Sequence, residues 1–472
     1  MHIHLVAICG VGMAPLAVLL KGEGHRVTGS DSAAFPPMSS VLADAGLEVL
    51  EGFDPANLEP RPDLVIVGNA VPRTNVEAVE AERLGLERMS FPQAMSELFL
   101  REARSLVVAG THGKTTTTGM LATALERAGE HPGFLIGGLI RDLGSFARAP
   151  QPGGYFAIEG DEYDSAYFDK RPKFIHYRPS AAIVTSVEFD HADIYRDLDH
   201  VKSSFRALAE LVPAGGPLVV CGDSADALSA VEGAGAGTPV RYGMGEANAW
   251  RPMSIATRDG LTRFEVVYNG SAEAEITLQI SGDMNALNAT AVYALCRTLG
   301  VESSGVVEGL AAYRGPARRQ EILGEPAGIT VIDDFAHHPT AVAATLEAVR
   351  ARFPGRRLRA VFEPRSNTSR RAVFQQPYAA ALAQADCVVV SAVFAKSNDP
   401  LSAEQMLSTE TLVEDLRRQG VEAWSASGPD EILDRMAPEL VEGDVVVCMS
   451  NGAFGNLPRR LLAAIDGESA GL

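Results

Sequence analysis

The chain has 472 residues, of which 46% are hydrophobic and 21% are charged, and its formal net charge is −19. The length predicts about three domains, and no apolar run reaches the roughly 20 residues that cross a bilayer, so we expect no membrane insertion. Nucleic-acid-binding proteins normally carry a basic face, and the acidic balance of this chain argues against one. We therefore expect no nucleic-acid partner, and the net charge is compatible with a local basic pocket for a small anion.

Short apolar runs alternate with helical patterns almost throughout, and this alternation predicts parallel α/β domains. A first domain is predicted over residues 1–103. It begins with a strand over residues 2–9, which leads into Gly10-Val11-Gly12, a helix over residues 14–21 and a strand that ends at Asp31.

A second domain is predicted over residues 104–315. Late in this domain the pattern changes, because Asp259-Gly260 and Asn269-Gly270 are strong hairpin-turn pairs. We therefore expect a small antiparallel insert, closed by a helix over residues 284–296. The main strands are predicted at residues 105–110, 155–159, 181–188 and 217–222.

A third domain with the same α/β alternation is predicted over residues 316–472. Its main strands are predicted at residues 329–334, 358–364, 387–393 and 444–450.

The cysteines are far apart in the sequence and mostly lie in apolar runs, which indicates buried thiols in a reducing compartment. The apolar N-terminus has no basic leader, so we interpret it as a strand and not as a signal peptide. We expect a cytoplasmic protein, and no oligomeric state is predicted. The five cysteines are Cys9, Cys221, Cys296, Cys387 and Cys448.

The stretch VVAGTHGKTTTTG has the layout of a phosphate-binding loop. An apolar strand breaks at Gly110, Gly113-Lys114-Thr115 follows, and a helical pattern begins there. The glycines permit a tight turn of backbone N–H groups, Lys114 can reach phosphates, and the hydroxyl of Thr115 can bind Mg²⁺. The usual spacing also has a glycine where this chain has Val108. A glycine-rich turn with a surface lysine is the alternative.

Two acidic clusters also follow predicted strands. Residues 159–162 read Glu-Gly-Asp-Glu, and Glu188, Asp190 and His191 follow the apolar run that ends at Val187. Either group alone can be a solvated loop or a structural histidine. Ligands bind at the carboxyl ends of strands in open α/β sheets, and Mg²⁺ prefers carboxylates and phosphate oxygens. Together with the phosphate loop, the clusters predict a Mg²⁺–nucleotide site, with one or two ions.

Three further groups are candidates. Arg318 and Arg319 can meet phosphate charge when domains close, although a basic linker explains them equally well. Asn288 can contact a base edge or serve as helix-cap chemistry. Gly10 to Gly12 make a turn that can accept a diphosphate. Pro15 stands where a dinucleotide fingerprint has its third glycine, which weakens the alternative of a dinucleotide oxidoreductase.

The ordered set GVGM, GSD, GTHGKTTT, EGDEYD, EFDHAD, NALNA, RRQ and DDFAHHPT resembles the Mur ligases, ATP-dependent enzymes that form amide bonds in bacterial peptidoglycan. The resemblance spans essentially the whole chain. It implies a Rossmann-like N-terminal UDP-binding domain, a central P-loop ATPase-type parallel sheet and a Rossmann-like C-terminal domain.

Within the family, the segments GFLIGGL, EGDEYDSAYFDKRPKF, EFDHADIY and FEPRSNTSRR resemble the members that ligate the tripeptide L-Ala-γ-D-Glu-meso-diaminopimelate to UDP-N-acetylmuramate. The resemblance therefore implies ATP, UDP-N-acetylmuramate and this tripeptide as substrates, an acyl-phosphate intermediate and a role in peptidoglycan recycling. The first alternative is the ligase that adds L-alanine in de novo synthesis. The second is a regulator that binds ATP and UDP-sugar and makes no bond.

Residue roles follow from the matched motifs. The resemblance implies a catalytic set of Lys114, Glu162, His191 and Arg319. It implies ATP contacts from Gly110, Thr111, His112, Gly113, Lys114, Thr115, Thr116, Asn288, Arg319 and Asp334. It implies Mg²⁺ ligation by Thr115, Glu162 and His191. The predicted UDP-binding residues are Gly10, Val11, Gly12, Met13 and Asp31. The predicted peptide-binding residues, which follow third-domain strands, are Arg365, Ser366, Asn367, Arg370, Ser450 and Asn451.

The chain departs from the family pattern at two points. Ser186 stands where related sequences often have Asn, which puts one polar contact in question. Some members carry a carbamylated lysine that supports a metal, whereas this chain has Arg206 near that place and Lys202 one helical turn earlier. We therefore predict no carbamate.

Overall fold

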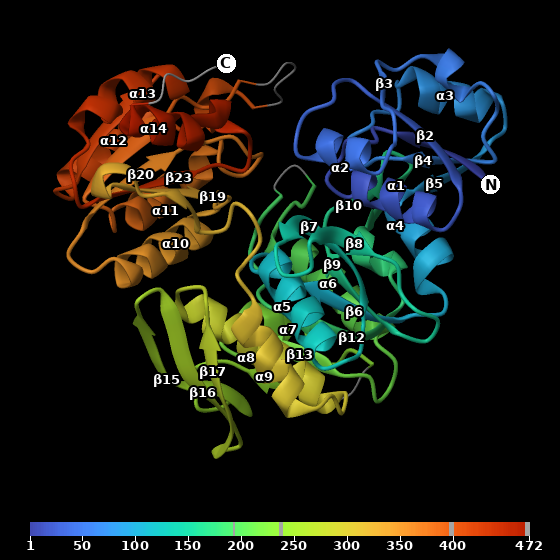
Figure 1. Cartoon of the computed structure of the whole chain (residues 1–472), viewed down its shortest axis with the longest axis horizontal. Coiled ribbons are helices and arrows are strands. Elements are labelled where there is room, and N and C mark those ends of the chain that lie inside the picture. The colour runs from blue at the N-terminus through green and yellow to red at the C-terminus, as the bar shows by residue number, and fades with distance from the viewer. Residues whose placement is uncertain (192–193, 236–238, 396–400, 468–472) are drawn as a thin grey trace.

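The computed structural model describes residues 1–191, 194–235, 239–395 and 401–467. Figure 1 shows three lobes, each built around its own main sheet, and the predicted α/β class is confirmed. Among the described residues, none of the helices combines the length and the apolar character that a bilayer-spanning helix requires.

The first sheet has five parallel strands in the order β3-β2-β1-β4-β5. The chain moves outward from β1 in both directions, which is the topology of a doubly wound sheet with a ligand crevice at the carboxyl end of β1. Its strands are β1 (His2–Val6), β2 (Arg26–Asp31), β3 (Leu50–Glu51), β4 (Leu64–Val67) and β5 (Glu87–Ser90), and its helices are α1 (Met13–Gly22), α2 (Met38–Asp44), α3 (Val76–Arg83) and α4 (Phe91–Met95).

The central sheet has the order β17-β16-β15-β14-β13-β12-β6-β9-β7-β8. Strand β6, which precedes the phosphate loop, lies between β12 and β9 and is parallel to both. The parallel core strands are β6 (Arg104–Ala109), β7 (Gly133–Ile140), β9 (Tyr155–Gly160), β12 (Pro179–Val184), β13 (Leu218–Cys221) and β14 (Val240–Tyr242). Strand β8 (Ser145–Arg148) is antiparallel at one edge, and a separate hairpin pairs β10 (Asp164–Ala166) with β11 (Asp169–Pro172). The helices are α5 (Lys114–Arg127), α6 (Leu198–Leu211), α7 (Ala225–Val231), α8 (Asp283–Thr298) and α9 (Ser303–Ala312).

The antiparallel meander consists of β15 (Trp250–Arg258), β16 (Leu261–Tyr268) and β17 (Ser271–Leu278). Asp259, Gly260, Asn269 and Gly270 all have positive φ, as two-residue hairpin turns require. The expected antiparallel insert is confirmed, and the pairing of Tyr242 with Trp250 joins it to the central sheet.

The predicted strand over residues 181–188 is too long at its carboxyl end, because β12 ends at Val184. The backbone N–H of Thr185 donates to the carbonyl of Ala109 at 3.0 Å, and its hydroxyl donates to the carbonyl of His112 at 2.5 Å. These bonds turn the chain toward the phosphate loop. The apolar Val187 is buried outside the strand.

The third sheet has the order β18-β19-β23-β20-β21-β22 and is parallel except for β18. Its strands are β18 (Glu321–Gly324), β19 (Thr330–Asp334), β20 (Arg357–Phe362), β21 (Cys387–Ser391), β22 (Glu422–Ala426) and β23 (Asp444–Met449). Its helices are α10 (Pro339–Arg352), α11 (Gln375–Leu382), α12 (Thr409–Arg418), α13 (Pro429–Met436) and α14 (Leu457–Asp466).

One apolar cluster spans the first and central lobes, which also have further clusters of their own, whereas the third lobe has clusters on the two faces of its sheet. Phe91 and Met95 of α4 belong to the same buried cluster as Phe174 and Tyr177 after β11. Strand β6 begins at Arg104 and β18 at Glu321. The predicted domain divisions at 103/104 and 315/316 lie just before these strands and stay predictions.

Candidate active site

The phosphate loop connects β6 to α5, and its two glycines have backbone conformations that favour glycine. Gly110 has a φ of +138°, and a Cβ there would lie 2.0 Å from the hydroxyl oxygen of Thr185. Gly113 has a φ of +81°, and a Cβ there would lie 3.1 Å from Oδ1 of Asn288. A side chain is excluded at Gly110 and disfavoured by the positive φ at Gly113, so the backbone can approach a ligand closely at both places.

Three predicted catalytic side chains meet at the carboxyl ends of neighbouring strands. Nζ of Lys114 lies 2.9 Å from Oε2 of Glu162, and Nε2 of His191 lies 3.7 Å from Oε1 of the same carboxylate. Glu162 is 2% exposed. Burial opposes the charged form of Lys114, but the charges of Glu162 and Asp161 outweigh it and raise the pKa of the lysine. The lysine is therefore held as a cation in the cleft.

The predicted metal ligand Thr115 donates its hydroxyl proton to Oε2 of Glu159 at 2.8 Å. Glu159 also accepts from the backbone N–H of Gly137 at 2.5 Å. Burial, together with the charge of Asp161, raises the pKa of the Glu159 carboxyl. Glu159 thus orients the threonine, a role that we did not assign to it from the sequence.

Ser186 retains a polar contact at the position where we had put one in question. Its hydroxyl accepts a hydrogen bond from the backbone N–H of His112 at 3.1 Å. At the second departure, both side chains contact α7 or the residue that follows it. Lys202 forms an ion pair with Asp226 at 2.6 Å, and Arg206 donates to the carbonyl of Glu232 at 2.8 Å.

A cavity of about 2010 Å³ brings the three lobes together around the phosphate loop. Phosphate-loop, first-lobe and third-lobe residues all line it, so one space can hold ligands that contact different lobes. The predicted ATP- and metal-site residues among its lining are Thr111, His112, Gly113, Lys114, Thr115, Thr116, His191, Asn288, Arg319 and Asp334.

The predicted UDP-binding residues fall into two groups. Val11 and Gly12 line the cavity, and Gly12 stands immediately before Met13, the first residue of α1. Asp31 ends β2 and accepts from the backbone N–H of Cys9 at 2.8 Å. Asp31 therefore shapes the turn that contains Gly10 in addition to any contact with ligand.

In the third lobe, Asp334 and Arg319 line the cavity for different structural reasons. Asp334 is 2% exposed and accepts from the backbone N–H groups of Gln320 and Ala336, both at 2.7 Å. It thereby anchors the segment that carries Arg319. The guanidinium carbon of Arg319 lies 4.9 Å from the ring centre of Phe335, which leaves the cation beside the cavity.

Of the six predicted peptide-binding residues, only Asn451 lines the cavity. Arg365 lies over the ring of Phe394, 3.7 Å from its centre, and close enough to Gly452 that a Cβ there would lie 2.1 Å from its Nε. Arg370 is 1% exposed. Ser366 exchanges hydrogen bonds with Ser369, and Ser450 donates to Glu363.

The sequence did not single out a lysine that lies on the opposite side of the acidic cluster. Nζ of Lys173 lies 3.0 Å from Asp161 and 3.2 Å from the hydroxyl of Tyr163, and all three line the cavity. The charge of Lys173 helps to lower the pKa of Asp161 despite its burial. The sequence feature that could have indicated Lys173 is the basic stretch of the β10–β11 hairpin. This hairpin brings the chain back to the end of β9.

The junction between the central and third lobes contains a histidine and carboxylate group. Nε2 of His112 and Nδ1 of His338 lie 3.3 and 3.7 Å from Oε2 of Glu188, and the hydroxyl of Thr340 donates to the same oxygen at 2.8 Å. Burial opposes ionisation of Glu188, but its interactions with His112, Thr340 and His338 together outweigh burial and lower the pKa to about 2. Burial lowers the pKa of His338 to about 4. The segments EFDH and AHHPT were noted in the sequence, but nothing there paired them.

Family models match nearly all of this architecture. The Mur ligase family catalytic domain matches residues 2–102, the Mur ligase middle domain residues 108–296, and the Mur ligase glutamate ligase domain residues 318–452.

Individual relatives extend the match over the full length. The chain is 39% identical over 464 residues to the Haemophilus influenzae UDP-N-acetylmuramate–L-alanyl-gamma-D-glutamyl-meso-2,6-diaminoheptandioate ligase, and 38% identical over 467 residues to the Escherichia coli protein of the same name, with 98% of each chain covered. It is 35% identical over 454 residues to the Desulfitobacterium hafniense UDP-N-acetylmuramate–L-alanine ligase, covering 96% of this chain and 97% of the other.

Two solved structures agree with the relatives. A murein peptide ligase from Psychrobacter arcticus superposes with a TM-score of 0.74 at 34% identity, with both chains fully covered. The UDP-N-acetylmuramate–alanine ligase of Thermotoga maritima gives a TM-score of 0.82 at 25% identity, with 99% of each chain covered. The chain therefore belongs to the Mur ligase family and is an ATP-dependent, ADP-forming ligase that makes a C–N bond, which rules out the non-catalytic and oxidoreductase alternatives.

Proposed function

We propose that the protein ligates the free tripeptide L-Ala-γ-D-Glu-meso-diaminopimelate to UDP-N-acetylmuramate in peptidoglycan recycling. The observation that carries the proposal is the full-length similarity, at 39% and 38% identity, to two ligases whose names state this acceptor and this peptide. The tripeptide is larger than L-alanine, and the cavity of about 2010 Å³ has room for a peptide beside the nucleotide and the UDP-sugar.

Each substrate is assigned to one predicted domain. UDP-N-acetylmuramate would bind residues 1–103 at the turn around Gly12, since a helix N-terminus favours a diphosphate. ATP would bind residues 104–315 on the phosphate loop. The peptide would bind residues 316–472, with Asn451 at the cavity and Arg365 next to it across Gly452. The burial of Arg370 suits it to supporting this loop instead of contacting ligand directly.

The residues predicted to hold Mg²⁺ fit that ion. Oε1 of Glu162 is buried without a hydrogen-bond partner among the described residues, and the ring of His191 lies on its open side. Thr115 is the hydroxyl residue at the start of α5. Carboxylate and hydroxyl oxygens beside phosphates suit Mg²⁺, which when bound would neutralise phosphate charge. We therefore propose Thr115, Glu162 and His191 as its ligands.

The proposed reaction has two steps. The lactyl carboxylate of UDP-N-acetylmuramate attacks the γ-phosphorus of ATP, which forms an acyl phosphate and releases ADP. The free amine of the peptide then attacks the acyl carbon, and the tetrahedral intermediate loses inorganic phosphate and a proton to give the amide. Lys114 and Arg319 stabilise the negative charge that develops on the transferred phosphoryl group, and the segment from Arg314 to Arg319 is the proposed hinge for closure.

Ligation of L-alanine is the second candidate function. It is favoured by the higher TM-score of 0.82 with the Thermotoga maritima alanine ligase, against 0.74 with the murein peptide ligase. We give more weight to sequence identity, because a TM-score also depends on how the lobes are oriented relative to one another.

The test is ADP release by the purified full-length chain with ATP, Mg²⁺ and UDP-N-acetylmuramate, with either tripeptide or free L-alanine as the amine. We expect turnover with tripeptide and a kcat/KM at least 10²-fold lower with L-alanine, about the discrimination that several lost polar contacts provide. Equal or better turnover with L-alanine would overturn the proposal and leave the family assignment intact.

A further inference from the structure

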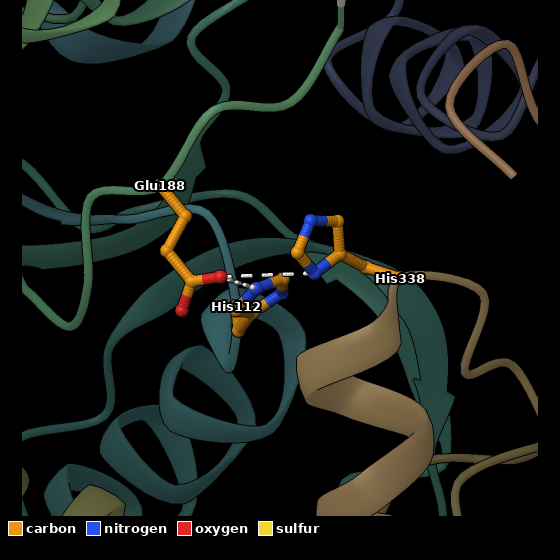
Figure 2. A group of neighbouring side chains, drawn as sticks. All are labelled: His112, Glu188 and His338. Atoms are coloured by element: carbon orange, nitrogen blue, oxygen red, sulfur yellow. Dashed lines mark ion pairs between the residues drawn. The ribbon is translucent and has the colours of Figure 1, made fainter. Parts of the chain in front are cut away.

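Two histidines and a carboxylate meet where the phosphate loop touches the third lobe. Figure 2 shows Glu188 reaching toward the ring of His112, with the ring of His338 beyond it at the start of a helix. The three side chains come from the loop after β6, the loop after β12 and the residue before α10. They form the junction cluster, and none of them belongs to the Mg²⁺ set proposed above.

The spacing of the junction cluster suits a small coordination sphere. One nitrogen or oxygen from each residue lies within 4.8 Å of the others, and the two nitrogens lie 3.3 and 3.7 Å from Oε2 of Glu188. Tetrahedral Zn²⁺ with bonds of about 2.0–2.2 Å places its ligand atoms roughly 3.4 Å apart. Small shifts of the side chains would bring all three donors onto one ion.

Among the described residues, the negative charge of Glu188 is not balanced by a lysine or arginine, so a cation could balance it. Glu162 is neutralised by Lys114, but no lysine or arginine pairs with Glu188 within the described part of the chain. Nε2 of His112 is buried and has no hydrogen-bond partner there, although it faces the carboxylate. A buried ring nitrogen without a partner is costly, and a metal ion would supply one.

The surroundings also match what a bound metal needs. Carboxylates that bind metals are usually held by a second hydrogen bond, and Thr340 donates to Glu188 at 2.8 Å. His338 is 5% exposed and is the N-cap of α10, where its Nδ1 accepts from the backbone N–H of Thr340 at 3.4 Å, a long hydrogen bond that an ion bound to Nδ1 would replace. The ring is therefore oriented before any ion arrives.

We propose that His112, Glu188 and His338 bind a divalent ion of the Zn²⁺ type, which joins the phosphate loop to the start of α10. Two imidazoles and one carboxylate are a ligand set that prefers borderline metals such as Zn²⁺ or Co²⁺ over Mg²⁺. The ion would hold the third lobe against the phosphate loop. This proposal is independent of which amine the ligase accepts.

The test uses the full-length chain, stripped of metals and kept in excess Mg²⁺ so that hard-cation sites are occupied. Co²⁺ serves as the probe, because its visible absorption reports a low-coordinate nitrogen and oxygen site. We expect one Co²⁺ per chain, displaced by Zn²⁺, and an affinity at least tenfold lower in His112→Ala, Glu188→Gln and His338→Asn. Asparagine is a good N-cap, so His338→Asn removes the ring while preserving the start of α10.

Two controls separate this site from other histidine sites. His131→Asn removes an exposed histidine that lies 3.4 Å from Glu126, and Co²⁺ binding should be unchanged. His191→Ala removes a proposed Mg²⁺ ligand, and the Co²⁺ spectrum should persist. The proposal is overturned if the wild-type chain takes up no Co²⁺, if folded His338→Asn binds it as tightly as the wild type, or if His191→Ala alone abolishes the signal.

Discussion

The carboxyl edges of the central and third sheets carry similar polar residues but use them differently. At the central edge, Lys114, Glu162 and His191 converge on one point, and Oε1 of Glu162 is left without a partner in the described structure. At the carboxyl edge of the third sheet, Arg365 stacks on Phe394, and Ser450 donates to Glu363. The central edge therefore gathers charged side chains around one carboxylate with a free oxygen, whereas the polar groups of the third sheet's edge mainly stabilise their own loops.

The substitution Lys114→Ala is expected to have the largest effect on activity. Removing the only lysine of the phosphate loop should lower ADP release by about 10³-fold or more, because stabilisation of phosphoryl-transfer charge is lost. Binding of UDP-N-acetylmuramate, measured by calorimetry, should survive. Lys202→Ala is the matched control, since Lys202 pairs with Asp226, and it should keep full activity. Retained turnover in Lys114→Ala would contradict the role given to the lysine.

Glu162→Gln should have the next largest effect, with kcat lowered by roughly 10²-fold. The amide is similar in shape but neutral, so the charge between Lys114 and His191 disappears. The Mg²⁺ concentration that gives half-maximal activity should rise together with the loss of kcat. A lower kcat with an unchanged Mg²⁺ requirement would assign Glu162 to orienting Lys114 alone.

The substitution Arg365→Ala tests whether the carboxyl edge of the third sheet binds the peptide. A charged hydrogen bond to a peptide carboxylate contributes about 1.5–3 kcal/mol, so the KM for tripeptide should rise by about tenfold or more while the KM for ATP stays constant. The control is Arg435→Ala, because Arg435 also stacks on an aromatic ring, with its guanidinium carbon 3.9 Å from the ring centre of Trp424. If both variants behave alike, Arg365 is a stacking residue and not a ligand-binding one.

The smallest expected effect is on stability at acid pH and concerns His337, which lies between β19 and α10. Burial lowers the pKa of His337 to about 4, whereas the unfolded chain has a value near 6.5. Below pH 6.5 the unfolded state binds more protons, so stability is complete above that pH and falls as the pH drops toward 4. His337→Gln should flatten this loss by roughly 1–2 kcal/mol, as urea unfolding at pH 7 and pH 5 would measure. An unchanged pH dependence would show that the ring is not buried in solution.

Much of the central site followed from the sequence because its signals are local. A phosphate loop needs glycines, a lysine and a hydroxyl within a few residues, and the acidic cluster stands directly after a strand. Since parallel strands end at one edge of a sheet, three such runs predict a common site. The hydrogen bond that orients Thr115 could not be predicted in this way, because Glu159, which accepts it, is 44 residues away in the sequence.

The roles of the polar residues at the carboxyl edge of the third sheet were harder to predict, because arginines and serines after a strand can serve two purposes. They can bind a ligand, or they can hold their own loop through stacking and hydrogen bonds, as Arg365 and Ser366 do. The burial of Arg370 depends on how that loop folds back over its own sheet. Nothing in the local pattern distinguishes these outcomes.

The sequence by itself determined the α/β class, the order of three sheets, the hairpin turns and the phosphate loop, because each depends on short-range periodicity or on the conformational freedom of glycine. Only the tertiary structure decided that β15 to β17 extend the central sheet, that Lys173 returns to the acidic cluster and that His112 meets Glu188 and His338. These contacts join segments far apart in the chain. Their geometry is set by the packing of whole lobes, which no local pattern encodes.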